Sequence, residues 1–245
     1  MNDGGTFPWA LIKRQSSSST KSTLDPTIST SPTETGPTHS TLGASGHQYC
    51  TPSLLTVSGL QVKMADTSFF NSIVPMMGSI LDALQAILTK AESHAKENNV
   101  DVNAEYATAK LYEDMKPVPF QVQAVSNGIK LFVERVAGVQ VGVWDDDETT
   151  FEQLFARINK TRELLNSIKP EAVNDKESQL VDVKAGPYVY KTSGLAYATT
   201  FAIPNIYFHL QTTFAILRMK GVPLGKRDYL FSFMTKDPNS TFAKA

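Results

Sequence analysis

Apolar residues recur at helical spacing along most of the chain beyond residue 65. The first such stretch predicts a long amphipathic helix, because its apolar positions fall three or four residues apart on one face. Asp66 or Thr67 can cap its first turn, Pro75 predicts a bend, and Asn98–Asn99 suits its end. The apolar face comprises Phe70, Ile73, Val74, Met77, Ile80, Leu81, Leu84, Ile87, Leu88 and Ala91.

A second long helix follows a short one. Asp101 can cap a short helical segment that ends by Lys110. The proline-containing stretch 116–119 is then an extended approach to the second long helix, which is predicted to stop at Gly138. Its apolar positions are Val122, Val125, Ile129, Phe132, Val133 and Val136.

An acidic loop precedes the third helix. Thr149 and Glu152 have the spacing of a capping box, in which each side chain accepts a hydrogen bond from the other residue's backbone amide. The acids from Asp145 to Glu148 then lie beside a helix N-terminus, where the macrodipole favours negative charge. They lack the spacing of a calcium-binding EF-hand loop. The apolar stripe of this helix is Phe151, Leu154, Phe155, Ile158 and Leu165.

The last part of the chain combines strand-like and helical patterns. Residues 179–193 alternate on both sides of Gly186 and Pro187, which predicts a short hairpin or an extended crossover. Pro204 kinks or restarts the helical region that follows, and the final long helix ends near Lys220. Four long helices with one lengthy connection before the last predict an all-α fold, a four-helix bundle with a crossover.

Composition divides the chain into three parts. Residues 1–63 are rich in Ser, Thr, Pro and Gly without sustained periodicity, which predicts a disordered tail. Residues 64–235 carry the helical pattern and are predicted to form the bundle domain, and residues 236–245 a flexible C-terminus. The tail is rich enough in acids to disfavour a mitochondrial transit peptide, so an upstream extension before Met64 is the alternative.

Charge and cysteine content narrow the classes of function. The net charge of −1, with Lys and Arg spread along the chain, argues against a nucleic-acid partner. A single cysteine, Cys50, excludes an intrachain disulfide. The absence of an uninterrupted apolar run of about 20 residues, and of an apolar leader, predicts a cytoplasmic protein without a membrane partner. The charge, cysteine content and hydropathy of the chain are also compatible with a homodimer.

Four stretches are distinctive: ILTKAESHAKE, PFQVQAVSNGIK, DDETTFEQLFARI and PNIYFHLQTTFAILRMKGVPLGKRDYL. Together they resemble an uncharacterised family, domain of unknown function DUF1993, which occurs in bacteria and fungi and is grouped with the DinB/YfiT-like metalloenzymes. The resemblance covers about residues 64–230. It implies the DinB-type four-helix bundle, in agreement with the periodicity.

The resemblance also implies where a metal would lie. The wider superfamily carries three histidines, one near the start of the second long helix and two at i, i+4 spacing on the last helix. His209 matches the first position on the last helix, but Thr213 stands four residues later. The position on the second helix falls at Gln123 or Ala124. A hydroxyl and an amide are poor ligands for zinc or nickel, so we expect no cofactor, and a divalent metal is doubtful.

His209 is the strongest candidate for chemistry. It lies in an apolar helix, where it is either a buried imidazole with a hydrogen-bond partner or a general acid/base at the mouth of a pocket. Gln121 and Gln123 begin the second helix and can hydrogen-bond a ligand or His209 across the bundle. Asn205 and Tyr207 lie near His209 in sequence, and Asn205 can instead cap the helix after its proline.

Three functions remain open on the sequence. The first is a protein that binds a small organic molecule in the bundle pocket near His209, with Gln121, Gln123, Asn205, Tyr207 and Thr213 as ligand-binding residues. The second is a small-molecule enzyme, of isomerase or tailoring type, that uses His209 as acid/base. The third is a metal-dependent transferase of the DinB/YfiT kind, against which Thr213 argues. No phosphate-binding loop, nucleophile elbow or zinc-protease motif is present.

Overall fold

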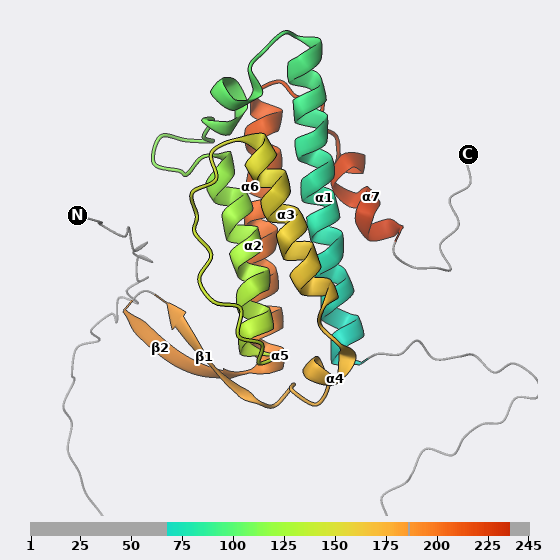
Figure 1. Cartoon of the computed structure of the whole chain (residues 1–245), viewed down its shortest axis with the longest axis vertical. Helices are drawn as coiled ribbons and strands as arrows, with labels where there is room; N and C mark the ends of the chain where they lie inside the picture. The colour runs from blue at the N-terminus through green and yellow to red at the C-terminus, as the bar shows by residue number, and fades with distance from the viewer. Residues whose placement is uncertain (1–67, 186, 236–245) are drawn as a thin grey trace, which may run out of the picture. The chain divides into compact units, whose positions relative to one another are not determined.

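Four long helices form the body of the protein (Figure 1). The computed structural model describes residues 68–185 and 187–235, so the tail predicted over 1–63 and the terminus predicted over 236–245 lie outside the described residues. The long helices are α1 (Phe69–Glu97), α2 (Val118–Arg135), α3 (Phe151–Asn166) and α6 (Ile203–Met219). The shorter elements are η1 (Asn103–Ala107), α4 (Pro170–Val173), β1 (Leu180–Ala185), β2 (Tyr188–Ser193), α5 (Gly194–Ala196), η2 (Tyr197–Ala202) and α7 (Lys226–Met234).

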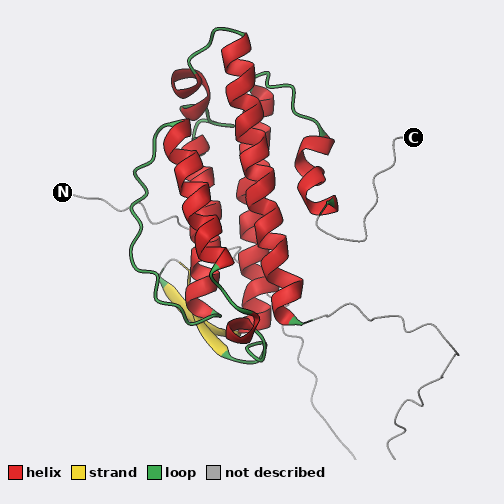
Figure 2. Ribbon diagram, turned by 45° about the vertical axis from the view of Figure 1, so that its right-hand side comes forward, coloured by secondary structure: helices red, strands yellow, loops and turns green. Residues whose placement is uncertain are grey.

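The four helices are arranged in a ring in which α1 and α2 each contact both α3 and α6. Figures 1 and 2 show α1 and α6 running in one direction and α2 and α3 in the other. The two long connections therefore differ, because only the one between the parallel helices α2 and α3 must return along the bundle. One, residues 136–150, follows α2 back to the start of α3, and the other, residues 167–202, crosses the end of the bundle and contains the hairpin. The predicted four-helix bundle with a crossover before its last helix is confirmed, with one further long connection.

The helix ends differ from the predicted caps by a residue or two. Ser68 caps α1, its hydroxyl accepting from the amide of Asn71 at 3.3 Å. The capping box of α3 consists of Thr150 and Gln153, because Gln153 Oε1 accepts from the Thr150 amide at 3.0 Å. The pairing of Thr149 with Glu152 was therefore wrong by one residue, while the position of the helix start was right.

The hairpin is present at the position that the alternation predicted. Strands β1 and β2 pair antiparallel, from Leu180 opposite Ser193 to Ala185 opposite Tyr188. The Ser193 hydroxyl then accepts from the amide of Ala196 at 3.2 Å and begins the helical region. A wide π-helical turn, η2, leads directly into α6, and Pro204 lies in the first turn of α6.

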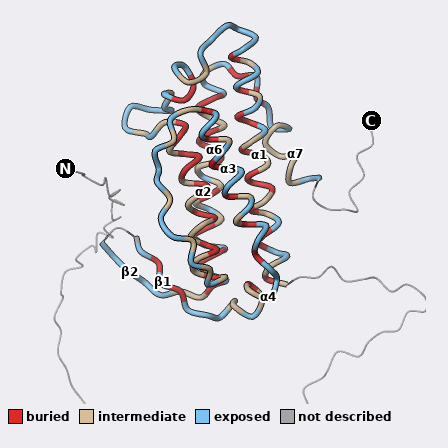
Figure 3. Tube along the Cα trace, viewed as in Figure 1, coloured by how far each residue is buried: buried red, intermediate tan, exposed pale blue. Residues whose placement is uncertain are grey.

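The core lies between the four helices (Figure 3). The apolar face of α1 forms its centre, and α1 continues without interruption through Pro75. The helix α1 is long and apolar enough to cross a membrane, but the core helix of a bundle can have the same length and composition. Here the apolar side chains of α1 pack against the other three helices. Asn98 ends α1 as expected.

A further helix, α7, was not among the predicted elements. It follows the last long helix and packs along α1. Asp228 joins the two, because its carboxylate accepts from Lys90 Nζ at 2.9 Å and from the Gly225 amide at 2.6 Å. No residue of α7 is fully buried, and its sequence therefore lacks the strong apolar stripe by which the other helices were predicted.

Candidate functional site

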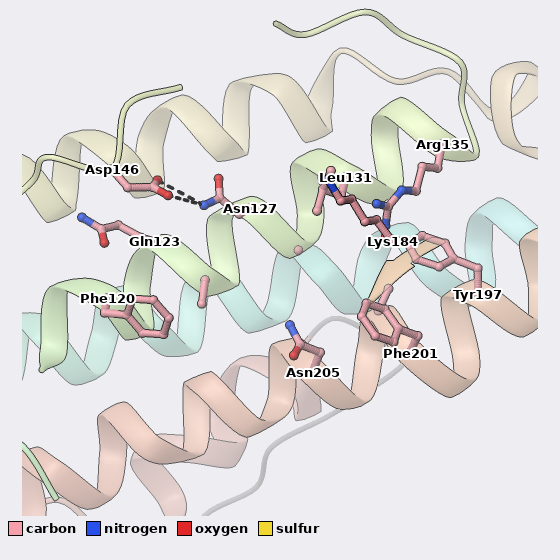
Figure 4. A pocket seen from close by; sticks show the side chains of 13 residues that line it. Phe120, Gln123, Asn127, Leu131, Arg135, Asp146, Lys184, Tyr197, Phe201 and Asn205 are labelled. Atoms are coloured by element: carbon pink, nitrogen blue, oxygen red, sulfur yellow. Dashed lines mark hydrogen bonds between the residues drawn. The ribbon is translucent and has the colours of Figure 1, made fainter. Parts of the chain in front are cut away.

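A cavity of about 260 Å³ lies along one side of α2. We call it the α2 cavity (Figure 4). Its floor is one face of α2, its walls are η2 with the start of α6 and the loop that carries Asp146, and Lys184 of β1 stands at one end. The lining residues are Phe120, Gln123, Ala124, Asn127, Gly128, Leu131, Arg135, Asp146, Lys184, Tyr197, Phe201, Ala202 and Asn205.

Helical periodicity explains the floor. Residues spaced three or four apart share one face of a helix, and the positions from Phe120 to Arg135 that line the cavity follow this spacing. Between Phe120 and Leu131 this face includes the small residues Ala124 and Gly128, which leave room above the helix. Gly128 is also required for the close approach of α6, because a Cβ there would lie 2.6 Å from Cγ1 of Ile206.

One end of the cavity is lined with amides and carboxylates. Asn127 Nδ2 donates to Asp146 at 2.9 Å, and Gln123 Nε2 donates to a Glu148 carboxylate oxygen at 3.0 Å. Arg157 reaches both acids from α3, at 2.9 Å from Asp146 and 2.8 Å from Glu148. Arg157 therefore compensates one of the two negative charges at this end, and the neutral amides of Asn127 and Gln123 hydrogen-bond the carboxylates.

The other end is basic and aromatic. Arg135 Nη1 donates to the hydroxyl of Tyr197 at 3.0 Å, and the guanidinium lies 5.2 Å from the centre of the same ring. Phe201 stacks on Tyr197, with the ring centres 5.9 Å apart. Burial raises the pKa of the Tyr197 phenol, so the hydroxyl stays protonated at neutral pH. Lys184 is exposed at the rim.

His209 forms a separate polar pair beside the α2 cavity. Its Nδ1 lies 2.7 Å from Oε1 of Gln121, whose own Nε2 donates to the Lys116 carbonyl at 2.9 Å. Because an amide oxygen can only accept, the proton sits on Nδ1 and the Nε2 lone pair of the neutral ring is left available. Burial lowers the pKa of His209 to about 4, so the ring is neutral at pH 7. The Phe120 ring meets the imidazole edge-on with centres 5.9 Å apart, and Phe120 itself lines the cavity.

A second cavity of about 300 Å³ adjoins the first beyond Phe120. We call it the η1 cavity, because Ala107 and Thr108 at the end of η1 form one wall. Phe120, Gln123 and Asp146 line both cavities, so the two are neighbours along the same side of α2.

The structure divides the predicted ligand-binding residues. Gln123 and Asn205 line the α2 cavity, whereas Gln121 pairs with His209 beside it, and His209 lines neither cavity. Thr213 is buried, and its hydroxyl donates to the His209 carbonyl at 2.9 Å. Tyr207 packs against Phe233 of α7, with ring centres 5.8 Å apart, away from the α2 cavity.

Two features of the site were not foreseen. Asn205 lies inside the first turn of α6 and is not its cap, since the helix already begins at Ile203. Arg135 and Tyr197 were missed altogether. Arg135 could have been found from the sequence, because it lies on the same face of the predicted second helix as Phe120. Its contact with Tyr197, 62 residues later in the chain, depends on how the crossover folds.

The described residues contain no group of three or more His, Cys, Asp and Glu side chains that could hold a metal ion. The two places where a superfamily ligand would stand are occupied by side chains with other partners. Gln123 bonds Glu148, and Thr213 bonds the backbone of its own helix. The donors beside His209 thus do not fit a zinc or nickel site.

The helices and their crossover place the chain in the class of DinB-type bundles. It is similar to a solved structure, that of a DinB family member protein from Shewanella denitrificans, with a TM-score of 0.61 and 29% sequence identity. The match covers 72% of this chain and 94% of that one. The chain belongs to the family of the domain of unknown function DUF1993, whose model matches residues 69–230. No curated protein matches it.

Proposed function

We propose that this protein binds a small organic molecule in the α2 cavity. The observation that carries the proposal is the cavity itself, a space of about 260 Å³ with an apolar floor and a few polar groups at its two ends. Small-molecule sites have this composition, since apolar contact supplies affinity and a few polar groups fix orientation. The site lies beside His209, separated from it by the Phe120 ring.

A neutral fluorescent probe tests this proposal. N-phenyl-1-naphthylamine gains fluorescence in apolar surroundings, and we expect it to bind the full chain with saturable enhancement. Ala124→Leu fills the floor of the cavity and should weaken binding at least tenfold. Ala156→Leu makes the same change at an exposed position of α3 and should leave binding unaltered. Equal binding by both variants and the parent chain would refute the site.

A second candidate is an enzyme in which His209 acts as acid or base. The hydrogen bond from Nδ1 to Gln121 favours it, because a fixed tautomer with an available Nε2 is how catalytic imidazoles are oriented. The lowered pKa of His209 makes the ring a weak base at pH 7. If the protein only binds its ligand, His209→Gln should retain binding of N-phenyl-1-naphthylamine.

The metal-dependent alternative has its own measurement. Because Thr213 and either Gln123 or Ala124 stand where the superfamily has histidines, we expect well under one equivalent of zinc, nickel or iron in protein purified without chelators. Elemental analysis of the parent chain and of His209→Ala gives the answer. One equivalent that is lost in the variant would revive a transferase of the DinB/YfiT kind.

A further inference from the structure

The α2 cavity is electrostatically asymmetric. Arg135 and Lys184 both line the end nearest the hairpin, and among the ion pairs between described residues none involves either of them. The nearest acid in sequence, Glu134, is paired with Lys130 at 3.3 Å on α2. This end therefore carries uncompensated positive charge.

The carboxylates at the opposite end have partners of their own. Asp146 accepts from Arg157 and Asn127, and Glu148 accepts from Arg157 and Gln123. The Arg157 side chain is 2% exposed, so its positive charge is held inside the network with the two carboxylates. A ligand that lies along α2 consequently meets two carboxylates that share one arginine at one end, and Arg135 and Lys184 at the other.

Tyr197 adds a directed donor at the basic end. Its oxygen accepts from Arg135 Nη1, which leaves its own O–H free to donate into the cavity that the residue lines. A guanidinium beside a phenol O–H is a set of donors without acceptors. Such a set suits a planar anion, because charge-assisted hydrogen bonds are the strongest that side chains form.

We propose that the molecule bound in the α2 cavity is a small organic carboxylate. Its carboxylate group lies between Arg135, Tyr197 and Lys184, and its apolar body lies over Leu131, Gly128 and Ala124 towards Phe120. The size agrees, since about 260 Å³ is below the roughly 300–1,000 Å³ of sites for drug-sized molecules. This inference rests on the function proposed above and specifies the chemical class of ligand.

Octanoate and octanamide separate charge from shape. The two have the same chain and nearly the same head group, but only octanoate is ionised at pH 7. We expect isothermal titration calorimetry on the full chain to show octanoate binding at least tenfold more tightly than octanamide. The preference should shrink as salt concentration rises.

Variants assign the preference to the basic end. Arg135→Gln and Tyr197→Phe should each weaken octanoate about tenfold and change octanamide little. Arg227→Gln removes an exposed arginine of α7 and should change neither. If Arg135→Gln fails to fold by circular dichroism, Lys184→Gln replaces it, because that exposed side chain has no partner among the described residues to lose.

The outcomes distinguish the two proposals. Equal affinity for octanoate and octanamide, or a preference that survives both variants, would overturn the carboxylate inference and leave the proposed binding function intact. Failure of both compounds would also overturn it. N-phenyl-1-naphthylamine, titrated in parallel, then decides whether the cavity binds at all, and its failure would remove the proposed function too.

Discussion

At the scale of single residues, the pair of His209 and Gln121 links α6 to α2. Gln121 is 3% exposed, and both ends of its amide are satisfied, one by the Lys116 carbonyl and the other by His209. A buried amide oxygen that loses its donor destabilises the fold more than the bond itself stabilises it. The pair is therefore a structural contact whichever function His209 has.

Replacing His209 with leucine tests this contact. We expect His209→Leu to lower the free energy of unfolding by about 1–3 kcal/mol, because Gln121 Oε1 is left unpaired. His209→Gln retains a donor and should be milder. In the double variant His209→Leu with Gln121→Leu, both polar groups are gone, so much of the loss should be recovered. Urea denaturation of these four chains and of Gln121→Leu measures the effect, and strictly additive losses would contradict the pairing.

The low pKa of His209 predicts a pH dependence of stability. In the folded protein the pKa is about 4, against about 6.5 in an unfolded chain. Below pH 6.5 the unfolded state binds a proton that the folded state does not, so stability falls as pH drops from 6.5 to 4. The loss reaches about 3 kcal/mol at most.

Carboxylates titrate in the same range, so the measurement is a difference between chains. Urea denaturation at pH 7 and pH 4.5 should show a smaller acid-induced loss for His209→Gln than for the parent chain. His94→Gln removes a histidine at the end of α1 and is the control. An identical loss in the parent and in His209→Gln would mean that the imidazole is not held neutral.

At the scale of elements, Arg157 holds the long connection between α2 and α3 in place. From α3 its guanidinium donates to the Asp145 carbonyl at 2.7 Å and forms ion pairs with two acids of that loop. Its Nε donates to Ser126 of α2 at 2.7 Å. Trp144 covers the guanidinium, at 5.0 Å from the ring centre. The acids that the sequence suggested for a helix N-terminus thus serve chiefly to bind one buried arginine.

Removing Arg157 should loosen this loop. Arg157→Met removes the ion-pair partner of Glu148 and the donor to Ser126, and we expect a loss of about 3–5 kcal/mol in the free energy of unfolding. Hydrogen exchange should quicken in residues 144–148. Arg162→Met is the matched control on the same helix. Its ion pair with Asp82 is 27% and 32% exposed and should contribute about 0–1 kcal/mol.

At the scale of the whole molecule, the described residues contain a complete core. Its buried apolar side chains extend from Phe69 to Leu224 and come from all four long helices and from the hairpin. We therefore predict that a chain beginning at Met64 folds as the full chain does. Circular dichroism should give the same helical signal per folded domain, with a melting temperature within about 2 °C. A drop of several degrees would show that residues 1–63 stabilise the bundle.

The sequence by itself determined the four long helices, the hairpin and which residues share a helix face. Periodicity predicted the stripe from Phe70 to Ala91, alternation predicted the hairpin, and the end of α1 followed from Asn98. These features are local, since they depend on residues a few positions apart. Gln121 was one of the two side chains at the start of the second helix that were expected to reach His209 across the bundle.

Tertiary structure decided which of those faces meet. The first turn of α1 receives a cap from Asn174, whose Oδ1 accepts from the Phe70 amide at 3.0 Å. At the start of α3, Asn103 Oδ1 likewise accepts a hydrogen bond from the Phe151 amide. Arg135 meets Tyr197 only because the crossover brings η2 back against the end of α2. Such contacts join residues tens of positions apart, and local spacing carries no information about them, because they follow from how the helices pack and not from the pattern along any one of them.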